Sequence, residues 1–260
     1  MKNKYSAIRA ISVITFILLW QLFSIYNQTS ALFNPKFLPA PSDIVITAID
    51  YLQKGTFFSN IWASLSRVLE GFIIGLLIAV VLGYFMAKSQ LLNNILDPIF
   101  SMISAVPAYA FMPLFIIWFG IGESAKITLI VYSTVMPMLS YTIQGVRSVD
   151  TLLVRSAKSL GANELQVFWT VVLKTALPFI FNGMKVTLGL TFSALIVAEM
   201  MGADMGLGYI IVNARNWFLV SDMFFAMVLI GALYITMKQI LIFVENKLFK
   251  WKKSGIDAIA

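Results

Sequence analysis

The sequence contains no cysteine and no histidine. Without thiols there is no disulfide and no thiolate chemistry, and without imidazoles there is no histidine general base or metal ligand. Charged residues are also scarce, at 12% of 260 residues against roughly 25% in a soluble domain. Apolar residues make up 60% of the chain, and the mean hydropathy is +0.87. These deficits indicate a protein whose solvent is a lipid bilayer.

The net charge of +7 has a different meaning in a bilayer than in water. On a soluble protein such a surplus would suggest a nucleic-acid partner. On a membrane protein it reflects cytoplasmic loops rich in Lys and Arg. We therefore expect membrane lipid, and no nucleic acid, around this chain.

Six apolar runs approach the roughly 20 residues that a helix needs to cross the hydrocarbon core. We predict an all-α membrane protein in which residues 1–260 form a single transmembrane domain. The predicted spans are residues 10–26, 71–87, 99–119, 127–143, 179–201 and 223–244.

The first run follows a basic N-terminus like that of a signal peptide. It is long, however, contains Trp20 and Gln21, and has no small-residue cleavage site after it. We therefore predict an uncleaved first helix. With six spans and a cytoplasmic N-terminus, the C-terminus is also cytoplasmic, and most of the 19 Lys and Arg residues lie inside. The predicted topology is N-in and C-in.

The first outside segment, residues 27–70, is a long connector in this prediction. Ser42 is the predicted N-cap of a helix over residues 43–53, and Gly55 is predicted to end that helix. Near the end of the segment, Arg67 and Glu70 stand three residues apart, which predicts a local ion pair.

Span two carries a stripe of small residues on one helix face. Gly71, Gly75, Ala79 and Gly83 recur every four residues, so another helix backbone can approach closely. Helix packing within the fold explains this stripe better than a gating role.

Span three is interrupted by Pro98, Pro107 and Pro113. Proline kinks a helix, and the freed carbonyls need protein or water partners in a bilayer. The span either lines a pathway or contains a tolerated kink. A further candidate for a functional residue is Glu199, an ionisable group at membrane depth before a glycine-rich turn. Glu199 either forms a gate or lock or anchors that turn.

The candidate pathway residues are Pro107, Tyr109, Met112 and Glu199.

A polar, basic loop over residues 146–178 differs from its surroundings. Asp150 is the predicted N-cap of a first helix, which Gly161 closes in the left-handed conformation. Asn163 is the predicted N-cap of a second helix, with Gln166 as its reciprocal partner. The loop is thus predicted to be a helix, a glycine hinge and a short helix.

The second helix, predicted over residues 164–174, has an apolar face. Leu165, Phe168 and Trp169 are spaced by three and four residues, so they lie on one side. An exposed apolar face of this kind is expected to be buried against another surface. Either the membrane interface or a groove on a soluble partner supplies that surface, and the pattern leaves both open.

The segment Arg155–Ala162, followed by Leu177 and Pro178, resembles the EAA loop of ATP-binding-cassette (ABC) importer permeases. Ala157 and Gly161 match the last Ala and the Gly of that motif, whereas Arg155 and Ser156 replace its Glu and first Ala. Further similar segments are residues 37–43, 64–72, 118–122, 198–202 and 206–208. Together they are most similar to the nitrate, sulfonate, taurine and bicarbonate subgroup.

The resemblance implies a type I importer fold and a dimer of permeases. It implies cytoplasmic ABC ATPases that bind ATP and Mg²⁺, and an extracytoplasmic substrate-binding protein. It assigns coupling to the ATPase to Ala157, Gly161, Ala162, Asn163, Glu164, Leu165, Phe168 and Trp169. The chain has no phosphate-binding loop motif, so we expect no cofactor in it and no enzymatic activity of its own.

The subgroup implies an anionic substrate such as sulfonate, taurine or nitrate, in a bacterial inner membrane. A vitamin precursor such as a thiamine pyrimidine is the alternative. A stand-alone secondary transporter would need intramembrane coupling groups or inverted repeats, and the sequence offers only Glu199 and no evident repeat. An intramembrane enzyme lacks catalytic groups, and the broken third span disfavours a purely structural subunit.

Overall fold

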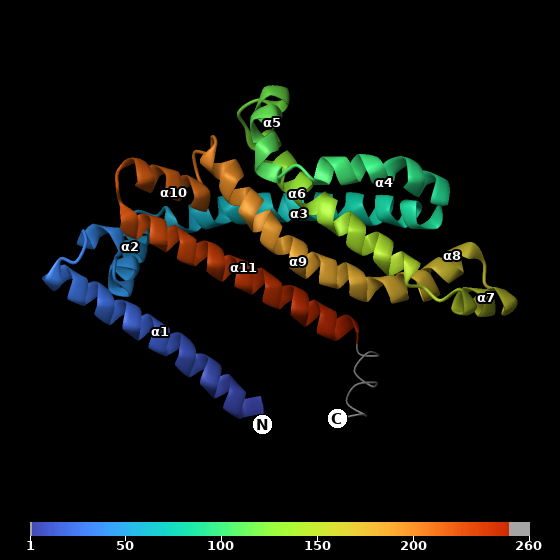
Figure 1. Ribbon diagram of the computed structural model, residues 1–260, viewed down its shortest axis with the longest axis horizontal. Coiled ribbons are helices and arrows are strands. Elements are labelled where there is room, and N and C mark those ends of the chain that lie inside the picture. The colour runs from blue at the N-terminus through green and yellow to red at the C-terminus, as the bar shows by residue number, and fades with distance from the viewer. Residues whose placement is uncertain (1, 250–260) are drawn as a thin grey trace. The chain divides into compact units, whose positions relative to one another are not determined.

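The computed structural model describes residues 2–249, and every regular element in this part of the chain is a helix (Figure 1). Five helices are long and apolar enough to span a bilayer, and a bent helix pair passes the same test when its two parts are taken together, as one broken span or a re-entrant loop. The all-α prediction is confirmed, and the five to six candidate spans agree with the six that were predicted. The five long helices are α1 (Lys2–Ser30), α3 (Phe57–Lys88), α6 (Glu123–Arg147), α9 (Leu173–Met200) and α11 (Val220–Leu248).

The chain forms two compact units that are interleaved in the sequence. The first consists of the residues up to Ser64 together with Asp204–Gly231. The second consists of Leu65–Ala203 and the chain from Ala232 onward. Helices α3 and α11 each contribute to both units.

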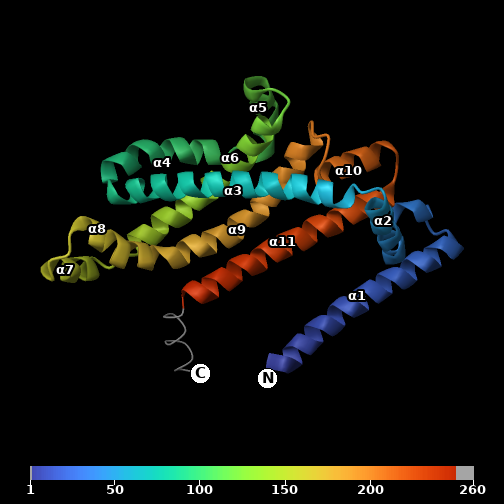
Figure 2. The same cartoon turned by 180° about the vertical axis from the view of Figure 1, so that it is seen from behind.

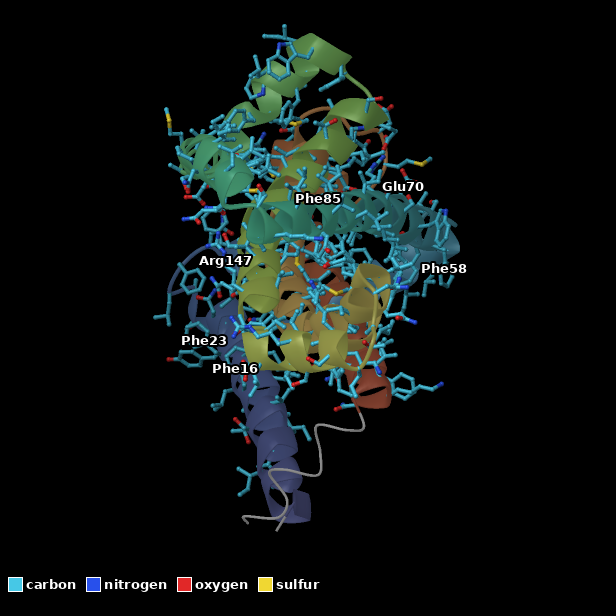
Figure 3. All side chains as sticks on the ribbon, turned by 90° about the vertical axis from the view of Figure 1, so that its right-hand side faces the viewer. Phe16, Phe23, Phe58, Glu70, Phe85 and Arg147 are labelled. Atoms are coloured by element: carbon cyan, nitrogen blue, oxygen red, sulfur yellow. The ribbon has the colours of Figure 1, made fainter. Side chains whose placement is uncertain are left out.

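In the first unit, α1 presents an apolar surface along most of its length. Phe16 is 66% exposed and Phe23 is 45% exposed on this helix (Figure 3). A run of exposed apolar side chains on a soluble protein would be an aggregation hazard, whereas in a bilayer it is the expected lipid-facing surface.

Helix α2 (Pro41–Gln53) begins two residues earlier than the sequence predicts, after η1 (Pro35–Phe37). Ser42 is not its N-cap, because Pro41 already supplies a helical φ at the first position. The Asp43 carboxylate accepts from the Ala40 N–H at 2.9 Å, and Ser42 instead bonds Gln21 of α1 through its N–H and hydroxyl. Gly55 follows the helix at φ +71°, so its predicted role as the stop is confirmed.

Tyr51 ties α2 to the start of α11. Its hydroxyl donates to Asp222 at 3.1 Å, and its ring stacks on Phe225 at 4.9 Å between centroids. Burial, together with the nearby Asp222 carboxylate, raises the pKa of the Tyr51 hydroxyl well above its ordinary value. The hydroxyl therefore stays protonated and keeps donating this bond.

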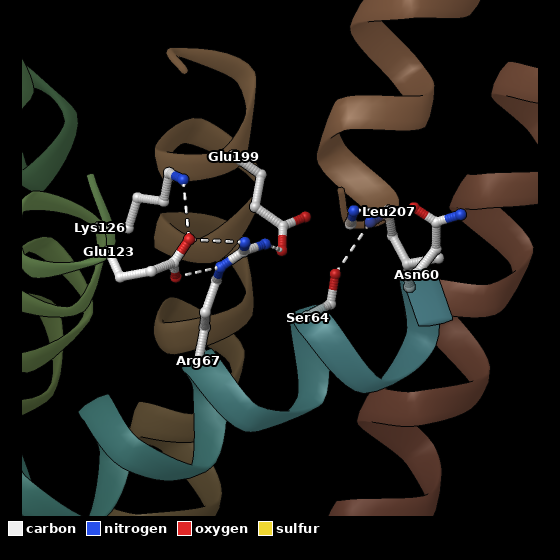
Figure 4. Close-up of polar contacts among 8 residues, drawn as sticks. Asn60, Ser64, Arg67, Glu123, Lys126, Glu199 and Leu207 are labelled. Carbon is white, nitrogen blue, oxygen red and sulfur yellow. Dashed lines mark hydrogen bonds and ion pairs between the residues drawn. The ribbon is translucent and has the colours of Figure 1, made fainter. Parts of the chain in front are cut away.

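Helix α3 begins at Phe57, so the residues directly before the predicted second span are helical, which the sequence did not predict. A further helix, α10 (Leu207–Asn216), was not predicted. Its first N–H groups are satisfied from α3, since Asn60 accepts from Gly206 at 2.9 Å and Ser64 accepts from Leu207 at 2.8 Å (Figure 4).

In the second unit, α6 and α9 run side by side and form its centre (Figure 2). The small-residue stripe of α3 packs on α6. Added Cβ atoms at Gly71, Gly75 and Gly83 would come within 3 Å of Ile130, Thr134 and Thr142 respectively. The prediction that this stripe allows close helix packing is confirmed.

Two glycines of α9 provide a matched test of this packing. A methyl group at Gly183 would lie 2.7 Å from Tyr141 Cβ, whereas one at Gly189 meets nothing closer than 3.8 Å. We expect Gly183→Ala to lower the free energy of unfolding by about 1–3 kcal/mol through overpacking. Gly189→Ala should be neutral or stabilising by up to about 1 kcal/mol, because alanine favours the helix. Unfolding by SDS titration measures both, and equal effects would contradict the close approach of α6 and α9.

The third span is broken, as the prolines predict. Helix α4 (Gln90–Ser104) and the segment formed by η2 (Ala108–Phe111) and α5 (Met112–Phe119) meet at 88°. The Tyr132 hydroxyl lies 2.7 Å from the Ile103 carbonyl and 3.0 Å from the Val106 carbonyl, so it satisfies groups freed at the break. Helix α4 begins nine residues before the predicted span, with Ser89 as its N-cap.

Candidate functional site

The loop between α6 and α9 folds by local signals. Helix α7 (Thr151–Ser159) starts at Asp150, whose carboxylate accepts from the Leu152 N–H at 2.8 Å. It ends at Gly161, which adopts φ +85°. A left-handed residue of this kind favours glycine because a side chain would be strained there. The predicted cap and hinge are both confirmed.

A second turn of helix, α8 (Glu164–Val167), begins with a reciprocal cap. The Asn163 side chain accepts from the Gln166 N–H at 2.8 Å, and the Gln166 side chain accepts from the Asn163 N–H at 2.9 Å. Lys158 of α7 pairs with Glu164 across the hinge. The cap defines the start of α8, and the exposed Lys158–Glu164 pair is a contact between α7 and α8.

The prediction that this helix ends before a separate fifth span is wrong. Helix α8 continues through a π-helical segment, η3 (Phe168–Val172), directly into α9, and Pro178 lies inside α9. One continuous helix therefore joins the loop to the predicted fifth span.

The predicted apolar face of this helix is divided between two environments. Leu165 is 67% exposed and Trp169 is 57% exposed, whereas Phe168 is half-buried with its ring edge-on to Tyr84 at 4.8 Å. Val167, which was not among the predicted residues, is buried. The loop is thus held to the second unit by one side and presents Leu165 and Trp169 on the other. Ala157 and Ala162 are half-buried beside the hinge.

A buried ion-pair network lies elsewhere in the second unit, where α3, α6 and α9 meet. The Arg67 guanidinium bonds both oxygens of Glu123, at 2.6 and 2.8 Å, and one oxygen of Glu199, at 2.7 Å (Figure 4). Lys126 bonds Glu123 at 3.0 Å. The predicted pair of Arg67 with Glu70 is wrong, because Arg67 faces the core and Glu70 is exposed.

The network is balanced in charge, and three of its four side chains are withdrawn from solvent, whereas that of Glu123 is 54% exposed. The side chains of Arg67, Lys126 and Glu199 are 9%, 5% and 0% exposed. Two cations and two anions compensate each other, which is the condition for burying such groups. Glu123 is also the first residue of α6, where the helix dipole favours a carboxylate. The arrangement joins three helices at one point.

The four predicted pathway residues separate in the structure. Pro107 and Tyr109 line a cavity of about 350 Å³ at the break in span three. Met112 is buried in a cluster with Phe115 and Leu129, and Glu199 belongs to the ion-pair network. Neither of these two lines that cavity, so the four residues do not share one cavity, and the pathway role of each stays a prediction.

Five to six candidate spans, one of them bent, and a structured loop before α9 define a multi-pass membrane protein. Residues 71–250 match the family described as the binding-protein-dependent transport system inner membrane component. The chain belongs to this family.

Two relatives and one solved structure are similar to the chain. The taurine transport system permease protein TauC of Escherichia coli (strain K12) is 36% identical over 203 residues, covering 76% of this chain and 74% of TauC. The putative aliphatic sulfonates transport permease protein SsuC of Bacillus subtilis (strain 168) is 32% identical, covering 92% and 85%. A crystal structure of an amino acid ABC transporter with histidines shares the fold, with a TM-score of 0.56 at 16% identity, over 80% of this chain and 97% of that one.

The chain is therefore an inner-membrane permease component of an ABC importer, and the prediction of that class is confirmed. Its relatives are transport permease components, which are not enzymes.

Proposed function

We propose that the chain forms the translocation pathway for a small organosulfonate or related anion that a binding protein delivers at the outer face. The named functions of its relatives, taurine and aliphatic sulfonate transport, support this substrate class. They give no support to a vitamin precursor. Two copies pair around the pathway, embedded in lipid, with N-terminus and C-terminus on the cytoplasmic side.

The observation that carries the proposal is the preorganised loop over α7 and α8. A cap at each helix and the hinge at Gly161 fix the loop, yet Leu165 and Trp169 remain exposed on it. A rigid helix with apolar anchors suits a groove on a soluble partner. We assign that groove to a cytoplasmic ABC ATPase, which binds ATP and Mg²⁺ and drives alternating access through the continuous α8–α9 helix.

Two changes in the exposed anchors test this assignment. In Leu165→Asp and Trp169→Ala, we expect at least a tenfold loss of the ATPase that co-purifies in mild detergent, and a similar loss of ATP-driven uptake, because the helix loses its apolar contacts. Trp62→Ala is the matched control, since Trp62 is 66% exposed on α3 outside the loop.

The control variant should retain both partner and uptake. If the unmodified chain purifies alone and transports without ATP, the importer assignment fails and a secondary transporter replaces it. If the ATPase co-purifies equally with all variants, the importer stands but the coupling surface lies elsewhere.

A further inference from the structure

The cavity at the break in span three lies entirely within the second unit. It is bounded by the end of α4, by η2, by α6 and by α9, and its volume of about 350 Å³ is at the lower end of small-molecule sites. Ser104, Tyr109 and Ser193 on its lining are exposed, so the cavity opens to the surface of the chain. A small solute can therefore enter it.

None of the described residues that line this cavity is charged. The polar groups are the hydroxyls of Ser104, Tyr109, Tyr132, Ser133 and Ser193, and the remaining lining is apolar. A bare anion here would lose its hydration without gaining a cationic partner, which is costly. The lining therefore disfavours a site built around a sulfonate group alone.

The same lining is suited to a positively charged group. Three of its hydroxyls already donate to helix carbonyls, Ser104 to Ser101, Ser133 to Ile130 and Ser193 to Gly189, so they present lone pairs to the cavity. A hydroxyl that has donated its hydrogen can only accept from a ligand.

The aromatic lining adds a further attraction. The helix ends at the break give no net preference, because Ser104 ends α4 while Ala108 begins η2. Tyr109 and Tyr132 line the cavity, and an ammonium group within about 6 Å of an aromatic ring face is attracted to it.

We propose that this cavity binds the ammonium end of a zwitterionic aminosulfonate during passage. The inference rests on the proposed function and narrows its substrate class, because a plain alkanesulfonate has no group for this site. The ammonium donates to the hydroxyl oxygens and lies against the tyrosine rings, and the sulfonate remains at the open side in contact with water.

Direct binding to the full chain in lipid nanodiscs, without a binding protein, tests the proposal. The probes are 2-aminoethanesulfonate and ethanesulfonate, which share the sulfonate and differ in the amine. Calorimetric titration should show the amine-bearing probe binding at least tenfold more tightly. Equal binding of both probes, or binding of neither, would overturn the proposal.

Two variants locate the binding. Ser193→Phe fills the cavity, and Tyr109→Leu removes a ring at a residue that is 63% exposed, so the second change leaves the fold intact even if the first does not. Both should weaken binding of 2-aminoethanesulfonate at least tenfold, whereas Tyr109→Phe, which keeps the ring, should weaken it less than Tyr109→Leu does. Unchanged binding in Tyr109→Leu would remove the site from this cavity. If the chain supports ATP-driven uptake of sulfonates but binds both probes equally, this inference is overturned and the proposed function stands.

Discussion

Replacing Arg67 by alanine should lower the free energy of unfolding by about 3–5 kcal/mol, the range measured when one partner of a buried ion pair is removed. Glu199 is fully buried and bonds the Arg67 guanidinium at 2.7 Å, so the variant leaves its charge in the core without that cation. Glu123 loses the guanidinium as well but retains Lys126. SDS titration of the purified chain measures the loss.

A double variant separates the burial of a charge from the loss of packing. Arg67→Met with Glu199→Met removes one cation and one anion, and the remaining Glu123 and Lys126 still compensate each other. Because apolar replacements of a buried pair are often neutral or stabilising, the double variant should be clearly more stable than Arg67→Ala. A double variant as unstable as the single one would mean that the helices depend on the charged groups themselves.

Lys54→Ala is the control for removing one partner of an exposed ion pair. Lys54 pairs with Asp50 on the surface, where their side chains are 63% and 49% exposed. Solvent screens such a pair, and its removal should change stability by no more than about 1 kcal/mol. A loss comparable to that of Arg67→Ala would contradict the assignment of the large effect to burial.

The contrast between the loop and the network shows which features the sequence predicts. The caps at Asp150 and Asn163 and the hinge at Gly161 join residues within a few positions, so spacing and residue type are enough. Arg67 pairs with Glu123 and Glu199, which are 56 and 132 residues away. A single sequence carries no signal for such a pairing, and the local partner Glu70 is the one that spacing favours.

Helix α10 and the start of α3 were missed for a related reason. Neither lies in a run apolar enough to predict a span, and the groups that stabilise the start of α10 come from Asn60 and Ser64, more than 140 residues earlier. At Pro178 the sequence predicted a helix boundary where the structure has none. A proline usually marks such a boundary but is tolerated inside a long membrane helix. The interruption of span three was predicted correctly, and the structure places it at Pro107, whereas Pro98 is tolerated inside α4.

Changing the hinge Gly161 to valine should abolish most ATP-driven uptake, with a loss of at least tenfold, while the chain remains folded. At φ +85° a side chain costs roughly 1–2 kcal/mol, and a β-branched one is the least tolerated. No atom lies within 4 Å of the added Cβ, so the strain is confined to the backbone and is relieved by reorienting α7 against α8. That reorientation displaces Leu165 and Trp169 from the positions in which, in the proposed function, they contact the ATPase.

Gly55→Val is the matched control for this strain. Gly55 has φ +71° and likewise no atom within 4 Å of an added Cβ, but it follows α2, outside the coupling loop. Both variants should lower stability by a similar amount, and only Gly161→Val should lose uptake and co-purified ATPase. Equal losses of uptake would show that transport responds to backbone strain anywhere in the chain. Full uptake in Gly161→Val would show that the angle between α7 and α8 does not determine coupling. Leu165 and Trp169 would then support uptake even though the loop that carries them is changed.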